Sequence, residues 1–190
     1  MRAGLLAFVL FVCVVIEMTL LDVIAVAGIR PSLLMIVALF VALWAPRSTA
    51  LWSCFLIGLL IDLTAPIAYA SWNQQHLPGP HALGLTFAAA FSLQLRAMLM
   101  RRQVFAFAVM MLIFAITASV VVVSVLTARS LFPTASPELA GYGPLRDLGQ
   151  RCVTALYTAV VSIPFGWLLL RTIPAWRFQS AVSAGSAAWR

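Results

Sequence analysis

Long apolar runs, separated by short polar stretches, dominate the pattern of residues along this chain. Six apolar segments are divided by breaks that contain proline, glycine or arginine. A helix needs about 20 mostly apolar residues to cross a bilayer, with a range of roughly 17–25. The pattern therefore predicts an all-α fold with about six transmembrane helices. The predicted spans are residues 5–27, 31–44, 49–65, 81–99, 103–126 and 151–170.

The second apolar segment, residues 31–44, is shorter than the others. It follows the sequence Gly28-Ile29-Arg30-Pro31, which we expect to end the first helix, since proline suits the first turn of a new helix. At 1.5 Å per residue this segment extends about 21 Å, against roughly 30 Å of hydrocarbon core. The pattern allows a tilted span, a thin span, or half of a re-entrant hairpin.

Composition supports a membrane environment. Of the 190 residues, 64% are apolar and only 9% are charged, whereas about a quarter of the residues are charged in an ordinary soluble domain. A soluble fold of this size could not bury so much apolar surface. We expect one helical bundle over residues 1–174 and a mobile tail of small residues at 175–190.

The N-terminal segment also has features of a secretory signal peptide. Arg2 precedes an apolar stretch, and Ala25-Val26-Ala27 imitates a cleavage site. However, the apolar run is longer than a signal peptide requires, and Glu17 and Asp22 interrupt it before that site. We therefore expect an uncleaved first transmembrane helix.

The net charge of +7 comes from arginine, because the chain has no lysine. The arginines lie at the ends of apolar runs, where the positive-inside rule explains them, so we expect no nucleic-acid partner. Eight arginines fall on the side that holds both termini, including the cluster at 96–102, and four fall on the other side. This asymmetry predicts that both termini are cytoplasmic. The second group consists of Arg30, Arg129, Arg146 and Arg151.

Asp62 directly follows an apolar run and is a candidate interaction residue. If its helix starts near residue 49, Asp62 lies about 20 Å across the bilayer, in the outer third. Gly58 lies on the same helical face and would let another helix approach closely. We therefore predict a helix joint closed by Asp62, paired with Arg30 or with backbone donors of the turn at 28–32. The alternative is a partly hydrated carboxylate at a helix end.

Glu17 and Asp22 are candidates for buried polar groups. Glu17 falls near the middle of the first predicted span, where a charged carboxylate is costly. It is either a protonated acid bonded to Thr19 or a neighbouring helix, or part of a ligand cavity. Asp22 reaches a depth similar to that of Arg30, so we expect Arg30 to be the cationic partner of Asp62 or of Asp22.

The sequence contains no pattern that indicates catalysis. His76 and His81 flank Pro78, which favours two loop histidines over a metal site. There is no glycine-rich phosphate loop and no nucleophile motif. The three cysteines lie in or beside apolar runs and are expected to be small buried residues. They are Cys13, Cys54 and Cys152. We expect no enzymatic activity, no metal and no cofactor.

Several short motifs occur in an order that resembles the MreD family of bacterial rod-shape-determining membrane proteins. These are Pro31-Ser32-Leu33-Leu34, the span end Gly58-Leu59-Leu60-Ile61-Asp62-Leu63, Gly79, the helix start Ala82-Leu83-Gly84 and the arginine-rich end at 96–102. The resemblance covers roughly residues 15–125. The proline-aspartate turn of the family is Pro31-Ser32 here, and the loop at 66–80 is longer than expected.

The resemblance implies a non-enzymatic scaffold of the cell-elongation machinery in the bacterial inner membrane. Members of this family associate with MreC, and through it with peptidoglycan synthases and the MreB filament. Their fold is similar to the substrate-binding subunits of vitamin transporters, so the alternative function is a small-molecule-binding transporter subunit. A receptor requires a cavity with converging polar groups, whereas a scaffold requires packed helices. The small number of polar residues in the spans favours the scaffold.

Overall fold

The computed structural model describes residues 3–19, 30–64, 79–96, 104–131 and 143–176. All regular secondary structure in these ranges is helical, which confirms the predicted all-α class. The helices are α1 (Ala3–Thr19), α3 (Leu33–Trp44), α4 (Arg47–Thr64), α5 (Pro80–Leu95), α6 (Val104–Ser130) and α7 (Pro144–Trp176).

The predicted boundaries need correction mainly between the predicted spans 103–126 and 151–170. α6 continues to Ser130 and α7 already begins at Pro144. A proline at the first helical position loses no hydrogen bond, since that N–H has no intrahelical partner. Residues 20–27 of the predicted first span and the predicted tail after Trp176 lie outside the described residues.

Three helices are long and apolar enough to cross a membrane. They are Arg47–Thr64, Phe105–Ser130 and Pro144–Thr172. α1 and α3 are apolar but shorter, and the 12 residues of α3 extend only about 18 Å. Judged by length and composition, the described residues therefore contain fewer membrane-spanning helices than the six that we predicted.

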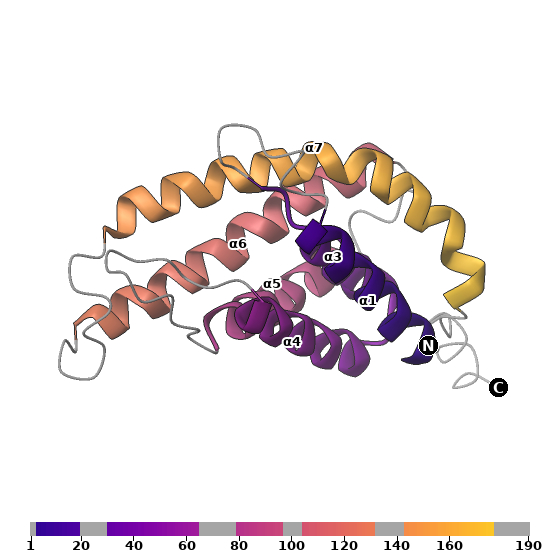
Figure 1. The fold of residues 1–190 in the computed structure, drawn as a ribbon, viewed down its shortest axis with the longest axis horizontal. Helices are drawn as coiled ribbons and strands as arrows, with labels where there is room; N and C mark the ends of the chain where they lie inside the picture. The colour runs from indigo at the N-terminus through magenta and orange to yellow at the C-terminus, as the bar shows by residue number, and fades with distance from the viewer. Residues whose placement is uncertain (1–2, 20–29, 65–78, 97–103, 132–142, 177–190) are drawn as a thin grey trace.

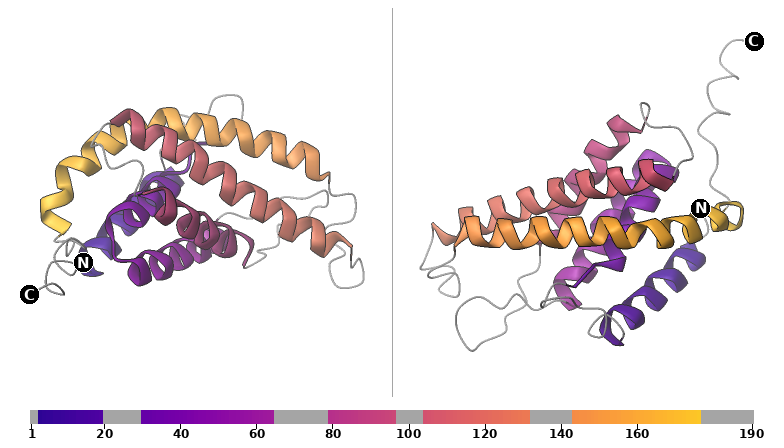
Figure 2. Two further views of the ribbon diagram at one scale, coloured as in Figure 1. Left: turned by 180° about the vertical axis from the view of Figure 1, so that it is seen from behind. Right: turned by 90° about the horizontal axis from the view of Figure 1, so that it is seen from above.

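The helices form two groups that pack against each other. α6 and α7 lie side by side as a long antiparallel pair, and α7 arches over the molecule (Figure 1). The shorter helices α1, α3, α4 and α5 gather beneath this pair, as the views in Figure 2 also show. Successive helices α4, α5, α6 and α7 pack neighbour against neighbour.

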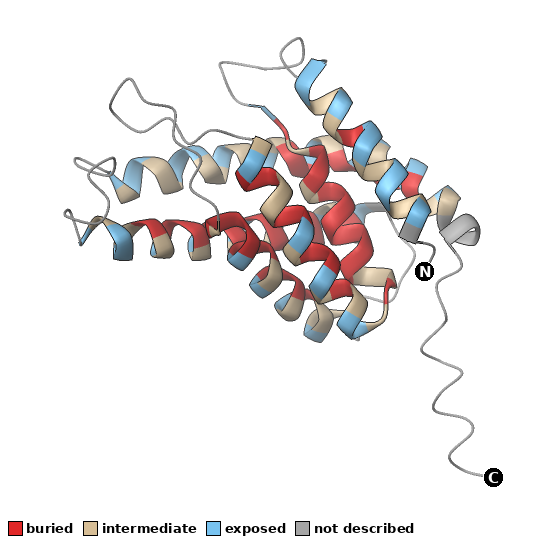
Figure 3. Cartoon of the chain, turned by 60° about the horizontal axis from the view of Figure 1, so that its bottom comes forward, coloured by how far each residue is buried: buried red, intermediate tan, exposed pale blue. Residues whose placement is uncertain are grey.

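α3 lies at the centre of the bundle. It contacts α1, α4, α5, α6 and α7, and nine of its twelve residues are buried. Figure 3 shows the buried residues concentrated in the middle of the molecule, with exposed residues on outward faces. A helix that is apolar on all sides is stable where other helices surround it. The short segment at 31–44 is thus a central core helix.

Two glycines mark close contacts between helices. A Cβ atom at Gly58 of α4 would stand 2.5 Å from the Cα atom of Ala82 in α5. A Cβ atom at Gly84 of α5 would stand 2.9 Å from the carbonyl oxygen of Ala118 in α6. Small residues at such positions let helix backbones approach closely. The two glycines therefore set the spacing of α4, α5 and α6.

The start of α3 differs from the sequence prediction by two residues. Ser32 is the N-cap, and its hydroxyl accepts a hydrogen bond from the N–H of Met35 at 3.4 Å. The N–H of Ser32 itself donates to the hydroxyl of Thr158 in α7 at 3.3 Å. Pro31 is buried just outside the helix, instead of occupying its first turn. The start of α3 is therefore tied to α7.

Candidate functional site

Asp62 is buried in the last turn of α4, with 1% of its surface exposed. Its Oδ2 accepts hydrogen bonds from the N–H groups of Gly79 at 2.8 Å and Ala82 at 3.2 Å. Its Oδ1 accepts from the N–H of His81 at 3.1 Å and contacts Nδ1 of the same residue at 2.7 Å. The carboxylate thus has four polar contacts, all at the N-terminus of α5.

The local sequence of α5 explains why this helix needs an external acceptor. The first N–H groups of a helix have no intrahelical partner, and a side chain at the N-cap position usually satisfies one of them. Here the N-cap is Gly79, which has no side chain and adopts φ +122°, a conformation that glycine tolerates. Asp62 of the neighbouring helix therefore takes the role of the capping side chain. Its negative charge also lies at the positive end of the α5 dipole.

His81 extends this contact to α7. Arginine has only donor groups, so Nη1 of Arg151 must donate to Nε2 of His81 across the observed 3.2 Å. Nδ1 of His81 then carries the proton and donates to Asp62. The geometry assigns a neutral imidazole that bridges a carboxylate and a guanidinium. Nε of Arg151 in turn donates to Oδ2 of Asp147 one helical turn earlier, at 2.9 Å.

These contacts form one polar chain across three helices, which we call the Asp62 network. Its members are Asp62 of α4, Gly79, His81 and Ala82 at the start of α5, and Arg151 and Asp147 of α7. Each oxygen of Asp62 already accepts hydrogen bonds, and the carboxylate is sealed from solvent. The arrangement is suited to fastening helices, since a fully satisfied polar network rigidifies the core around it.

The structure corrects the partner that we predicted for Asp62. Among the described residues, the donors at this carboxylate lie at 79–82, not at Arg30 or in the turn that ends at Ser32. The depth of a residue in the bilayer does not determine which neighbouring element reaches it. Arg30 itself is exposed. The prediction that His81 is a loop histidine is also corrected, because it is a buried residue of α5.

A second carboxylate makes a related contact at the start of α3. Oε2 of Glu17 in α1 accepts a hydrogen bond from the N–H of Leu34 at 3.3 Å. Leu34 lies in the first turn of α3, so Glu17 also satisfies a helix N-terminus from a neighbouring helix. This contact resembles the hydrogen-bonded alternative that we considered for Glu17. Asp22 lies outside the described residues.

The two carboxylates belong to a short internal repeat that the sequence analysis missed. Ile16-Glu17-Met18-Thr19 and Ile61-Asp62-Leu63-Thr64 each end a helix and lie 45 positions apart. Glu17 accepts from the residue 17 positions later, and so does Asp62. The threonine hydroxyls donate to the carbonyl oxygens of Val15 and Leu60, which are also 45 positions apart. Each acid thus accepts a hydrogen bond at the N-terminus of another helix, but Asp62 replaces a missing capping side chain, whereas α3 also has its own N-cap, Ser32.

Gly58 and Asp62 act on the same neighbour. One helical turn separates them on the buried face of α4. Gly58 lies against the backbone of Ala82 and His81, and Asp62 binds the N–H groups of the same two residues. The close approach that Gly58 permits brings the α5 N–H groups within hydrogen-bonding distance of the carboxylate. The glycine and the aspartate are therefore two parts of one joint between α4 and α5.

The described residues contain no cluster of three or more His, Cys, Asp or Glu that could hold a metal ion. The cysteines at 13, 54 and 152 are free thiols. Cys54 is buried, and its Sγ donates to the carbonyl oxygen of Ala38 at 3.4 Å, which links α4 to α3. No feature of the sequence places His81 or Arg151 beside Asp62. The repeat around Glu17 and Asp62 could have drawn attention to helix N-termini as partners of the two acids.

Comparison of the chain with protein-family models, with curated proteins and with solved structures gave no match.

Proposed function

We propose that this chain is a non-enzymatic scaffold of the cell-elongation machinery in the bacterial inner membrane, as its resemblance to MreD implies. The observation that carries the proposal is the joint formed by Gly58 and Asp62. These residues belong to one of the short motifs on which the resemblance rests, and here they lock α4 onto α5. A scaffold requires such a fixed arrangement of helices, because a partner must meet the same surface each time.

The direction of the polar groups supports the scaffold over a small-molecule transporter subunit. A ligand site needs polar groups that converge on a cavity. Asp62, His81 and Arg151 are directed at one another, and Glu17 is directed at the start of α3. These hydrogen bonds join groups of the bundle to one another. The buried acids therefore serve the packing of helices in this proposal.

Apolar outward faces provide the surfaces on which lipid or partner helices would pack. On α5 the exposed side chains Leu83, Phe87 and Phe91 are spaced by four residues and form one stripe. On α1 the large exposed side chains also lie close together. They are Phe8, Phe11, Val12, Val15 and Met18. The partners we propose are an MreC-like membrane protein, peptidoglycan synthases and, indirectly, the MreB filament.

The test is affinity isolation of the tagged full-length chain from bacterial membranes in mild detergent. We expect MreC-like and cell-wall synthesis proteins to be recovered with the unmodified chain. Asp62→Asn should reduce their recovery several-fold, while the amount of chain inserted in the membrane remains similar. Asp147→Asn is a matched control, because it makes the same chemical change at the more exposed end of the network.

Two results would contradict the proposal. Recovery of a transporter ATPase in place of cell-wall proteins would favour the transporter subunit. Equal recovery of cell-wall proteins with Asp62→Asn and with the unmodified chain would show that the joint has no part in forming the complex.

A further inference from the structure

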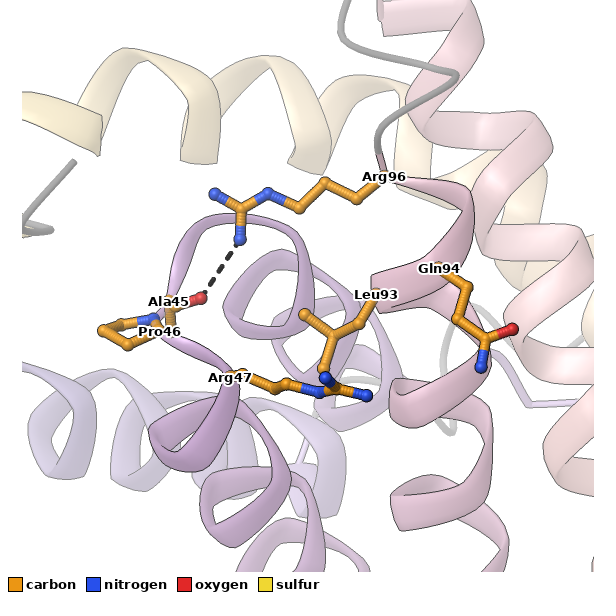
Figure 4. Close-up of a pocket in the computed structure, with 6 residues that line it drawn as sticks. All are labelled: Ala45, Pro46, Arg47, Leu93, Gln94 and Arg96. Atoms are coloured by element: carbon orange, nitrogen blue, oxygen red, sulfur yellow. Dashed lines mark hydrogen bonds between the residues drawn. The ribbon is translucent and has the colours of Figure 1, made fainter. Parts of the chain in front are cut away.

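A pocket lies at the end of the bundle opposite the Asp62 network. It has a volume of about 380 Å³ and is formed where the turn between α3 and α4 meets the last turn of α5. Its lining residues are Ala45, Pro46, Arg47, Leu93, Gln94 and Arg96 (Figure 4). Two of them are arginines, and the other polar side chain is a neutral amide.

The two arginines are held in different ways. Nη1 of Arg96 donates to the carbonyl oxygen of Ala45 at 3.1 Å, which anchors the guanidinium across the pocket (Figure 4). Arginine has five N–H donors, so this single bond leaves further donors for another acceptor. Arg47 is exposed and begins α4, so its side chain and the positive end of the α4 dipole lie together. Both features favour a negative charge in the pocket.

The described acids lie at the other end of the bundle. Glu17 contacts the start of α3, Asp62 contacts the start of α5, and Asp147 is bonded to Arg151 in the same network. α3 ends and α4 begins at the pocket, on the far side from those contacts. None of the three acids lines the pocket. Among the described residues, the positive charges of Arg47 and Arg96 are therefore not neutralised by an acid in the pocket itself.

The position of the pocket suits a lipid headgroup. If α4 crosses the bilayer, its first residue lies at the membrane surface, and Arg47 and Arg96 belong to the side predicted to be cytoplasmic. The cytoplasmic leaflet is rich in anionic lipids, and basic pockets between transmembrane helices bind their headgroups. Leu93 and Pro46 provide apolar surface beside the charges, as a lipid that continues into acyl chains requires.

We infer that this pocket binds the phosphate group of an anionic phospholipid, with Arg96 and Arg47 as its cationic ligands and Gln94 as a polar neighbour. Arginine forms paired hydrogen bonds with phosphate oxygens, which gives the site geometry as well as charge. The site requires membrane insertion, but it does not depend on the proposed scaffold function, because no protein partner takes part.

The test is lipid binding to the purified full-length chain in a neutral detergent, followed by native mass spectrometry. We expect phosphatidylglycerol to bind more tightly than phosphatidylethanolamine. Arg47→Gln should weaken phosphatidylglycerol binding about fivefold, the loss expected for one basic side chain near an anionic surface. Arg129→Gln is the matched control, because it removes an exposed arginine at the end of α6 and should leave binding unchanged.

Arg96→Lys provides a second variant that keeps the positive charge. It should weaken phosphatidylglycerol binding less than Arg96→Gln does, since a lysine keeps the positive charge and has three N–H donors, although it lacks the planar fork of arginine. Thermal unfolding of each variant without lipid checks that the fold survives when the contact between Arg96 and Ala45 is changed. Glycerol 1-phosphate is added in competition to distinguish a lipid from a soluble phosphate compound.

Three results would overturn the inference. Equal binding of phosphatidylglycerol and phosphatidylethanolamine would remove the requirement for a net negative charge. Equal effects of Arg47→Gln and Arg129→Gln would show that lipid binding depends only on the total charge of the chain. Displacement of the lipid by millimolar glycerol 1-phosphate would assign the site to a soluble phosphate compound.

Discussion

The N–H of Gly79 donates to Oδ2 of Asp62 at 2.8 Å and thereby joins the last turn of α4 to the first turn of α5. Gly79 has a positive φ, which glycine adopts readily, and no side chain that could cap the helix. Asp62 supplies the acceptor instead and also bonds to His81 and Ala82. The cap of α5 is thus supplied by Asp62, which precedes Gly79 by 17 positions in the chain.

Asp62→Asn should destabilise the bundle, although asparagine has nearly the same shape as aspartate. The groups that reach the two oxygens of Asp62 are donors, so the NH₂ group of an asparagine would face another N–H. We expect a loss of about 1–3 kcal/mol in the free energy of unfolding, the cost of an unsatisfied buried polar group. Unfolding in mixed micelles with a denaturing detergent measures it.

Asp147→Asn is the control for that change. The Asp147–Arg151 contact joins two residues of the same helix, so Asp147→Asn leaves the contact between α4 and α5 in place and should cost less stability than Asp62→Asn. If Asp62→Asn and Asp147→Asn lowered the free energy of unfolding equally, the proposed importance of the hydrogen bonds between Asp62 and the α5 N-terminus would be refuted.

Gly58→Ala should separate α4 from α5. The new Cβ atom would stand 2.5 Å from the Cα atom of Ala82 and 2.6 Å from the carbonyl oxygen of His81, so the backbones must move apart. Overpacking of this kind costs about 1–3 kcal/mol, measured as the free energy of unfolding. The same substitution at Gly149, where an added Cβ atom would meet no described group outside its own stretch of helix within 4 Å, should be neutral or stabilising. Similar losses at both positions would argue against a close contact at Gly58.

His81 variants separate the two contacts of the imidazole. His81→Leu removes the donor to Asp62 and the acceptor for Arg151, and should cost about 1–3 kcal/mol. His81→Asn places an amide N–H near the position of Nδ1 and should recover part of that loss. Thermal unfolding of both variants tests this order. Identical unfolding temperatures for the two would mean that the contact between the side chains of His81 and Asp62 contributes nothing.

The orientation in the membrane is tested by cysteine labelling. In a background without the three native cysteines, Gln150→Cys at the start of α7 should react with a membrane-impermeant reagent added to intact cells. Ser48→Cys at the start of α4 is also exposed in the fold and should react only after the cells are opened. These two positions are chosen from the arginine asymmetry, which places them on opposite sides. The reverse labelling pattern would invert the predicted topology.

The sequence alone determined which segments are helices. In an apolar solvent every backbone N–H and C=O must be satisfied within the chain, so long apolar runs form helices wherever they occur. The expected starts at 81 and 103 lie one residue from those of α5 and α6. The face shared by Gly58 and Asp62 also followed from the sequence, because helical periodicity places residues four apart on one side.

Only the tertiary structure decided which faces meet. In a membrane protein both the lipid-facing and the core-facing side chains are apolar, so periodicity does not reveal the packed side of a helix. The sequence therefore could not show that α3 is surrounded by other helices, or that His81 lies between Asp62 and Arg151. A carboxylate accepts any suitable donor that packing brings near. Asp62 contacts the α5 N-terminus and not Arg30 because the backbones of α4 and α5 approach closely at Gly58.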